Sequence, residues 1–127
     1  MPTPPPTLAL DYGEQRVGVA RSIGTLAEPI KVLANNSTLI NKLRSLIEQF
    51  SITQLVVGIS ENQTAQRTID FVDRLKTELQ LPVLTWDETL STQQARAKIK
   101  QSRQLDPKEP VDHFAAAEFL QDWLDSN

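Results

Sequence analysis

The sequence predicts an α/β fold in which a mixed five-stranded sheet carries helices on its faces. Two short apolar stretches near the start are joined by a turn, which predicts a β-hairpin. Helical and strand patterns then alternate along the rest of the chain, which is typical of strands joined through helices. With 127 residues, the chain is long enough for one domain with a substantial core and too short for two ordinary domains.

The first three strands are expected to be a hairpin followed by an edge strand. Residues 8–10 and 17–20 are rich in Val, Leu and Ala, and the turn-prone residues 12–14 lie between them. Residues 28–33 form the third strand. We expect it at the edge of the sheet because Pro29 has no N–H to donate to a neighbouring strand.

The following segments alternate between helical and strand patterns. Leu39 and Leu46 belong to a stripe at helical spacing, and Ile69 and Val72 belong to another. Residues 54–60 form an uninterrupted apolar run, which indicates a strand buried on both faces, as in parallel sheets. The elements predicted after the third strand are a helix at 39–50, a strand at 54–60, a helix at 64–79, a strand at 81–86, and helices at 91–101 and 111–124.

Composition narrows the chemistry that the chain can carry. It has no cysteine, which excludes disulfides, thiolate metal sites and a cysteine nucleophile, and its single histidine excludes a His-rich zinc site. Carboxylates and hydroxyls remain as metal ligands. The formal net charge of −3 gives no overall basic surface, so any contact with nucleic acid has to be local.

Residues 1–7, MPTPPPT, are expected to be a disordered, proline-rich leader, and residues 8–127 a single domain. The start of the chain has neither the basic nor the apolar region of a targeting signal. No later segment approaches the roughly 18 apolar residues of a membrane span. We therefore expect a cytoplasmic protein without membrane contact.

Four acidic residues stand where α/β sheets usually bind ligands, beyond the carboxyl ends of the strands. Asp11 ends the first strand, Asp87 and Glu88 end the last, and Asp112 begins the terminal helix. Each acid also has a purely structural explanation. Asp11 is of a residue type that favours turns, and Glu88 and Asp112 would stabilise helix N-termini. Asp112 shares a helical face with Ala116, which lets it lie on the inward side of its helix. Together, these acids predict a metal site.

The predicted ions are Mg²⁺ or Mn²⁺, which prefer hard oxygen ligands and keep several waters. Two such ions about 4 Å apart can activate a water and stabilise the leaving oxygen when a phosphodiester is cleaved. A cluster of acids alone would repel a polyanion, and bound ions would supply the positive charge that the chain lacks. Electrostatics therefore favours a metal-dependent phosphoryl-transfer site over a purely acid–base one.

Four motifs, in this order, make the chain resemble the YqgF/RuvX family over residues 8–124. They are LALDYGEQRVGVARS, VVGIS, WDETLSTQQA and VDHFAAAEFL. The resemblance implies an RNase H-like fold and a nuclease that processes the 5′ end of pre-16S ribosomal RNA or, alternatively, resolves Holliday junctions. It also implies catalytic and metal-binding roles for Asp11, Glu88 and Asp112. Because adjacent strand residues point to opposite faces, Asp87 is kept as the alternate ligand to Glu88.

Substrate contacts are expected from basic residues. Arg96, Lys100 and Arg103 share a helical face and are predicted to grip the phosphate backbone, the alternative being a solvated helix surface. Arg16, beside the turn that follows Asp11, is a further candidate for a phosphate contact. Tyr12 is more typical of a packing residue than of a platform for base stacking.

Two features depart from the family pattern: the loop GISENQTAQ at residues 58–66, and Thr89 in place of a basic residue. They leave the acids intact but favour an alternative, a nucleic-acid-binding module of the same fold with weak catalysis. The expected partner is pre-ribosomal RNA or branched DNA. Resolving a symmetric junction would require two active sites and hence a homodimer, whereas trimming one RNA strand would not. An actin-like ATPase is excluded, because the chain has no room for a second lobe.

Overall fold

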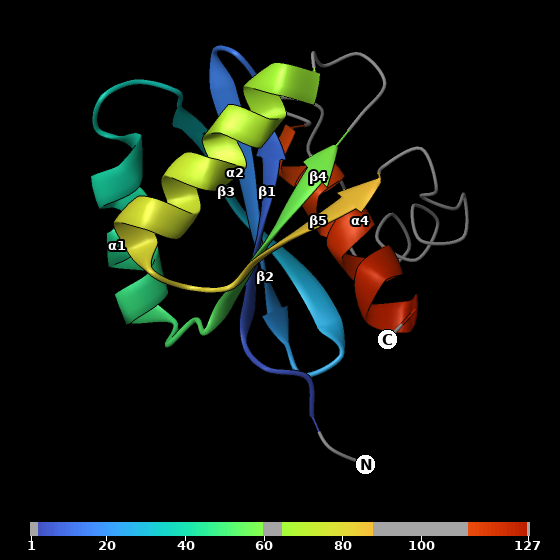
Figure 1. The fold of residues 1–127 in the computed structure, drawn as a ribbon. Coiled ribbons are helices and arrows are strands. Elements are labelled where there is room, and N and C mark those ends of the chain that lie inside the picture. Colours follow the sequence, from blue (N-terminus) through green and yellow to red (C-terminus); the bar gives the residue numbers. More distant parts are fainter. Residues whose placement is uncertain (1–2, 60–64, 88–111, 127) are drawn as a thin grey trace.

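The computed structural model describes residues 3–59, 65–87 and 112–126. Its centre is a five-stranded sheet with the strand order β3-β2-β1-β4-β5 (Figure 1). The first three strands pair antiparallel, while β4 runs parallel to β1 and β5 parallel to β4, so the predicted mixed sheet is confirmed. The elements are β1 (Thr7–Tyr12), β2 (Arg16–Ile23), β3 (Leu26–Ala34), α1 (Leu39–Gln49), β4 (Gln54–Ile59), α2 (Ala65–Leu79), β5 (Val83–Asp87) and α4 (Asp112–Ser126).

Strand β3 lies at the edge of the sheet, as Pro29 predicted. Pro29 pairs with Ala20, and the next pair along the ladder joins Lys31 to Val19. The register therefore shifts at this point, with Ile30 as the extra residue of a bulge. A bulge is one of the few places where a sheet tolerates a residue that cannot donate a hydrogen bond.

The two faces of the sheet carry separate cores. Leu8 and Leu10 of β1 pack into a core covered by α1 and α2, on what we call the α1/α2 face. Ala9, between them, packs against Ala116 and Leu120 of α4, on the α4 face. Small side chains on both sides of this second contact let the helix approach the sheet closely. Figure 1 shows α4 on the opposite side of the sheet from α1 and α2.

Helix α2 buries a face slightly different from the predicted one. Thr68, Phe71, Val72 and Leu75 are buried, whereas Ile69 is 49% exposed. The expectation that Ile69 packs in the core is therefore wrong, because the contact with the sheet is centred on Phe71 and Leu75, and Ile69 falls on the flank of that stripe. The helix predicted at 91–101 lies outside the described residues.

The start of β1 is tied into the sheet. The strand begins at Thr7, one residue before the predicted Leu8, and the Thr7 N–H donates to Ser22 Oγ at 2.9 Å. The carbonyl of Pro6 accepts a hydrogen bond from the Thr53 N–H at 2.9 Å. Among the described helices, none combines the length and apolarity needed to span a bilayer.

Candidate active site

Asp11 lies near the carboxyl end of β1, the central strand, between two glycines. It pairs with Gly18 of β2 on one side and with Gly58 of β4 on the other. Neither neighbour contributes a side chain, which leaves the sheet surface on both sides of Asp11 without side-chain bulk. Because side chains alternate along a strand and Ala9 packs against α4, Asp11 belongs to the α4 face. It is a half-buried carboxylate at the edge where ligands of α/β sheets bind.

The turn that follows Asp11 is held by Asn35, the residue after β3. Asn35 donates from its side-chain Nδ2 to the Gly13 carbonyl at 2.8 Å, and from its backbone N–H to the Gln15 carbonyl at 2.9 Å. A Cβ atom on Gly13 would lie 2.5 Å from the carbonyl oxygen of Arg16, closer than such atoms approach. Only glycine fits this turn, so the position of Asp11 depends on it.

Arg16 opens β2 at the far side of the same turn and is exposed. The next residue, Val17, belongs to the core on the α1/α2 face, so strand alternation places position 16 on the α4 face with Gly18 and Asp11. The predicted phosphate contact and the predicted metal ligand thus share one face of the sheet.

Strand β5 brings an aromatic residue into the same row as Asp11. Gly58 pairs with Trp86 as well as with Asp11, so Trp86 lies two strands away from Asp11. Trp86 packs against the α4-face core, whereas Val83 belongs to the opposite core. Within the described part of the chain, the buried indole N–H of Trp86 has no hydrogen-bond partner. Such an unpaired donor is unfavourable by about 1–3 kcal/mol, which makes it a candidate for a ligand contact.

Helix α4 begins at Asp112 and is anchored near its other end by Gln121. The Gln121 side-chain oxygen accepts from the Ala27 N–H, and its Nε2 donates to the Thr25 carbonyl, both at 3.0 Å. These two residues lie in the β2–β3 hairpin, at the amino end of β1. The helix therefore starts toward the carboxyl end of β1, where Asp11 lies (Figure 1).

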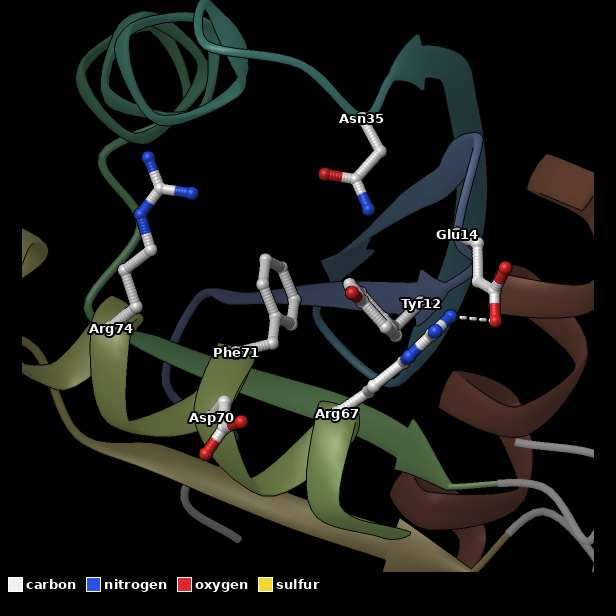
Figure 2. A pocket seen from close by; sticks show the side chains of 7 residues that line it. All are labelled: Tyr12, Glu14, Asn35, Arg67, Asp70, Phe71 and Arg74. Carbon is white, nitrogen blue, oxygen red and sulfur yellow. Dashed lines mark hydrogen bonds and ion pairs between the residues drawn. The ribbon is translucent and has the colours of Figure 1, made fainter. Parts of the chain in front are cut away.

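A pocket of about 360 Å³ opens on the α1/α2 face beside the β1–β2 turn (Figure 2). The rings of Tyr12 and Phe71 stack inside it with their centroids 4.5 Å apart, which confirms the packing role predicted for Tyr12. Arg67 forms an ion pair with Glu14 across the rim. The sequence pattern of α2 does not indicate this pocket, because helical spacing identifies only the buried side of the helix.

The family model described as "RuvX: Holliday junction resolvase" matches residues 6–126. The chain belongs to the RuvX family. It is 30% identical over 131 residues to a "Putative pre-16S rRNA nuclease" of Desulforamulus reducens, a match that covers 94% of this chain and 96% of that protein. It is 33% identical over 130 residues to the protein of the same name from Koribacter versatilis, covering 93% of this chain and 85% of the other.

The fold of this RuvX chain is similar to that of RuvC. The structure "T. thermophilus RuvC in complex with Holliday junction substrate" superposes with a TM-score of 0.63 at 11% identity, covering 97% of this chain and 95% of that one. Pelota of Archaeoglobus fulgidus gives a TM-score of 0.52 at 16% identity, over 37% of its own chain. The predicted RNase H-like fold is confirmed.

Part of the predicted site of the RuvX chain lies outside the described residues. For Asp87 and Asp112, the structure gives the backbone position, at the end of β5 and the start of α4. Among the side chains that the structure describes, no three acidic or histidine residues gather into a metal-binding group. Four predicted residues are outside the described ranges: Glu88, Arg96, Lys100 and Arg103.

Proposed function

We propose that this RuvX chain is a metal-dependent nuclease that cleaves phosphodiester bonds in structured nucleic acid, with Asp11, Glu88 and Asp112 as ligands of two Mg²⁺ or Mn²⁺ ions. The most specific form of the proposal is processing of the 5′ end of pre-16S rRNA, since that activity is in the names of the relatives. The observation that carries it is Asp11 at the carboxyl end of the central strand, between Gly18 and Gly58.

The dimensions of α4 support Asp112 as a partner of Asp11. From Gln121 back to Asp112, the helix rises about 13.5 Å. Gln121 is bonded to Ala27, which lies in the row of the sheet that contains Thr7. From Thr7 to Asp11, β1 runs about 13 Å. These two lengths agree, which favours a helix start that is level with Asp11 on the same face.

The alternation of β5 supports Glu88 rather than Asp87. Trp86 packs on the α4 face and Val83 on the opposite face. If β5 continues by one residue, position 88 falls on the same face of the sheet as Trp86 and Asp11, and position 87 falls on the face of Val83. Glu88 is therefore the acid that a strand geometry would direct toward Asp11.

The donor set fits hard divalent cations, because it consists of carboxylates and the chain has no thiolate to select a softer metal. The ions would supply an activated water and positive charge at the leaving oxygen. The three acids would hold them, and glycines at 18 and 58 leave room for their waters and for a phosphodiester. Arg16 would neutralise a neighbouring phosphate, and the stretch of Arg96, Lys100 and Arg103 would extend that contact along the strand.

Holliday junction cleavage is the second candidate, and two observations favour it. The matching family model is described as a Holliday junction resolvase, and the structural neighbour with a TM-score of 0.63 is a RuvC bound to a Holliday junction. This activity would require a homodimer with two active sites, whereas RNA trimming would not. With either substrate, we place the protein in the cytoplasm.

A paired cleavage assay tests the proposal. The purified protein would be given Mg²⁺ or Mn²⁺ with a pre-16S leader RNA and, separately, with a four-way DNA junction. Asp11→Asn should reduce the cleavage rate by about 10²-fold or more, since it removes a carboxylate that would hold the ions whose positive charge stabilises the transition state. The matched control is Asp73→Asn, on the exposed face of α2, which should cleave as the wild type does.

Chelation with EDTA should stop cleavage and leave the circular dichroism spectrum unchanged. Wild-type cleavage rates in a folded Asp11→Asn protein, or in EDTA, would contradict the proposal. Cleavage of the junction but not of the RNA would select the second candidate.

A further inference from the structure

The pocket beside the β1–β2 turn has aromatic rings at its centre and an arginine toward each end (Figure 2). Arg67, Phe71 and Arg74 lie at i, i+4 and i+7, so they share one face of α2. Phe71 is only 6% exposed and is stacked under Tyr12, which is half-buried. A planar ligand entering this pocket would meet Tyr12, with a guanidinium on either side.

The polar lining suits a nucleotide better than a simple anion. Arg67 and Arg74 are balanced by Glu14 and Asp70, so the pocket has no net charge. A ligand that carries phosphates together with hydrogen-bond donors can bind both the arginines and the carboxylates. Asn35 adds a side-chain amide oxygen that can accept from a base, because its Nδ2 already bonds the turn. The volume falls in the range of pockets that hold small organic ligands.

The ion pairs of the two arginines leave donors for a phosphate. Arg74 uses its Nε to bond Glu78 at 2.8 Å, and the guanidinium has further N–H groups. The pair between Arg67 and Glu14 is open to solvent, with side-chain exposures of 56% and 70%. Exposed pairs of this kind contribute little to stability, so a phosphate can replace the carboxylate at small cost.

The pocket lies next to the candidate metal ligand but on the other face of the sheet. Tyr12 follows Asp11 directly in β1, and strand alternation puts the two side chains on opposite faces. Both sit at the carboxyl end of the central strand, beside the same turn. A nucleic-acid strand that passes over this edge can therefore reach both.

We propose that this pocket binds one unpaired nucleotide of the substrate strand. The base packs against Tyr12 and bonds Asn35, and the phosphates on its two sides are held by Arg67 and Arg74. Stacking on an aromatic side chain and contacts to phosphate are how proteins bind single strands without reading their sequence. The proposal rests on the proposed nuclease function, and it gives the substrate an unpaired segment beside the scissile bond.

A binding assay in EDTA tests the pocket separately from cleavage. The probes are short, fluorescently labelled, 5′-phosphorylated oligouridylate and oligothymidylate, followed by fluorescence anisotropy. Arg67→Gln should weaken binding by about five- to tenfold, and Glu14→Gln should strengthen it by about two- to fivefold, because it releases Arg67 from its carboxylate partner. The control is Arg21→Gln, which breaks an ion pair with Glu28 at the opposite end of β2 from the pocket and should bind as the wild type does.

The opposite changes in probe affinity expected for Arg67→Gln and Glu14→Gln distinguish a binding role of Arg67 from a structural one. Both substitutions break the same ion pair, so an effect through folding would move both affinities in the same direction. Changes of the same sign, or none in either variant, would overturn the proposal, and so would the absence of binding by both probes. Binding of either probe with opposite effects of the two variants supports it.

NMR spectra of the labelled protein provide the second readout. The uridylate and thymidylate probes should shift the amide signals of Tyr12, Asn35 and Phe71 and leave those of the β2–β3 hairpin unchanged. Shifts that avoid the pocket would overturn the proposal even if cleavage by the wild type and its loss in Asp11→Asn uphold the nuclease function. Pocket binding by a wild-type protein that does not cleave would instead refute the nuclease function alone, and undiminished cleavage by Asp11→Asn would refute only the role of Asp11.

Discussion

Gln121 fixes the far end of α4, and replacing it with leucine separates hydrogen bonding from packing. Its side chain is 6% exposed and is bonded to the Ala27 N–H and the Thr25 carbonyl at 3.0 Å, and to Asp125 at 3.1 Å. Leucine is of similar size but can make none of these bonds. The Ala27 N–H would lose its hydrogen-bond partner, which lowers the free energy of unfolding by about 1–3 kcal/mol. Loss of the hydrogen bond to the solvent-accessible Thr25 carbonyl lowers it by about 0.5–1 kcal/mol more.

We therefore expect Gln121→Leu to lower the free energy of unfolding by about 2–4 kcal/mol in urea denaturation followed by circular dichroism. The matched control is Gln66→Leu on the exposed side of α2, where the side chain bonds Asp70 at 3.0 Å. That change should stay within about 0.5 kcal/mol. If Gln121→Leu were as stable as the wild type, the hydrogen bonds would not be what holds α4 to the hairpin, and the reasoning would be refuted.

Three further predictions concern the sheet and its faces. Leu10→Ala should lower the free energy of unfolding by about 2–5 kcal/mol in urea titrations, because the side chain is fully buried. Gly13→Ala should slow cleavage at least tenfold, because its Cβ would lie 2.5 Å from a backbone oxygen beside the site. The control Gly24→Ala has a φ of +59° and open space around it, so it should lower the free energy of unfolding by about 1–2 kcal/mol and cleave normally. The reverse order of cleavage rates would contradict this prediction. Ala116→Leu should overpack the contact between α4 and the sheet, costing about 1–3 kcal/mol and weakening Mg²⁺ binding measured by calorimetry; unchanged Mg²⁺ affinity would count against a role for the start of α4 in the site.

The order of strands and helices was predictable because each element carries its own local signal. The hairpin follows from two apolar stretches around a turn, and the edge position of β3 follows from the missing N–H of Pro29. The position of Asp11 followed from the same logic, since a carboxylate that ends an apolar strand is visible in the sequence.

Features that depend on pairing between distant segments were not predictable. Gly18 and Gly58 flank Asp11 only because of the register that β2 and β4 adopt against β1. The bond between Gln121 and Ala27 joins residues 94 positions apart, and no local pattern indicates it. The core face of α2 was misjudged at Ile69 because the helical period alone does not say where the sheet will touch the helix.

The position of α4 has a consequence for the order in which the molecule is completed during synthesis. The alanines of β1 and β2 on the α4 face have their packing partners at residues 116–124, which leave the ribosome long after both strands. Until then, the sheet can bury only its α1/α2 face, because the contacts that cover the other face span most of the chain. The same helix begins with Asp112, the last of the proposed metal ligands along the chain. Packing of α4 on the sheet therefore buries the second core and brings Asp112 to the sheet at the same time. A nascent chain would thus lack part of the proposed metal site until its fold is complete.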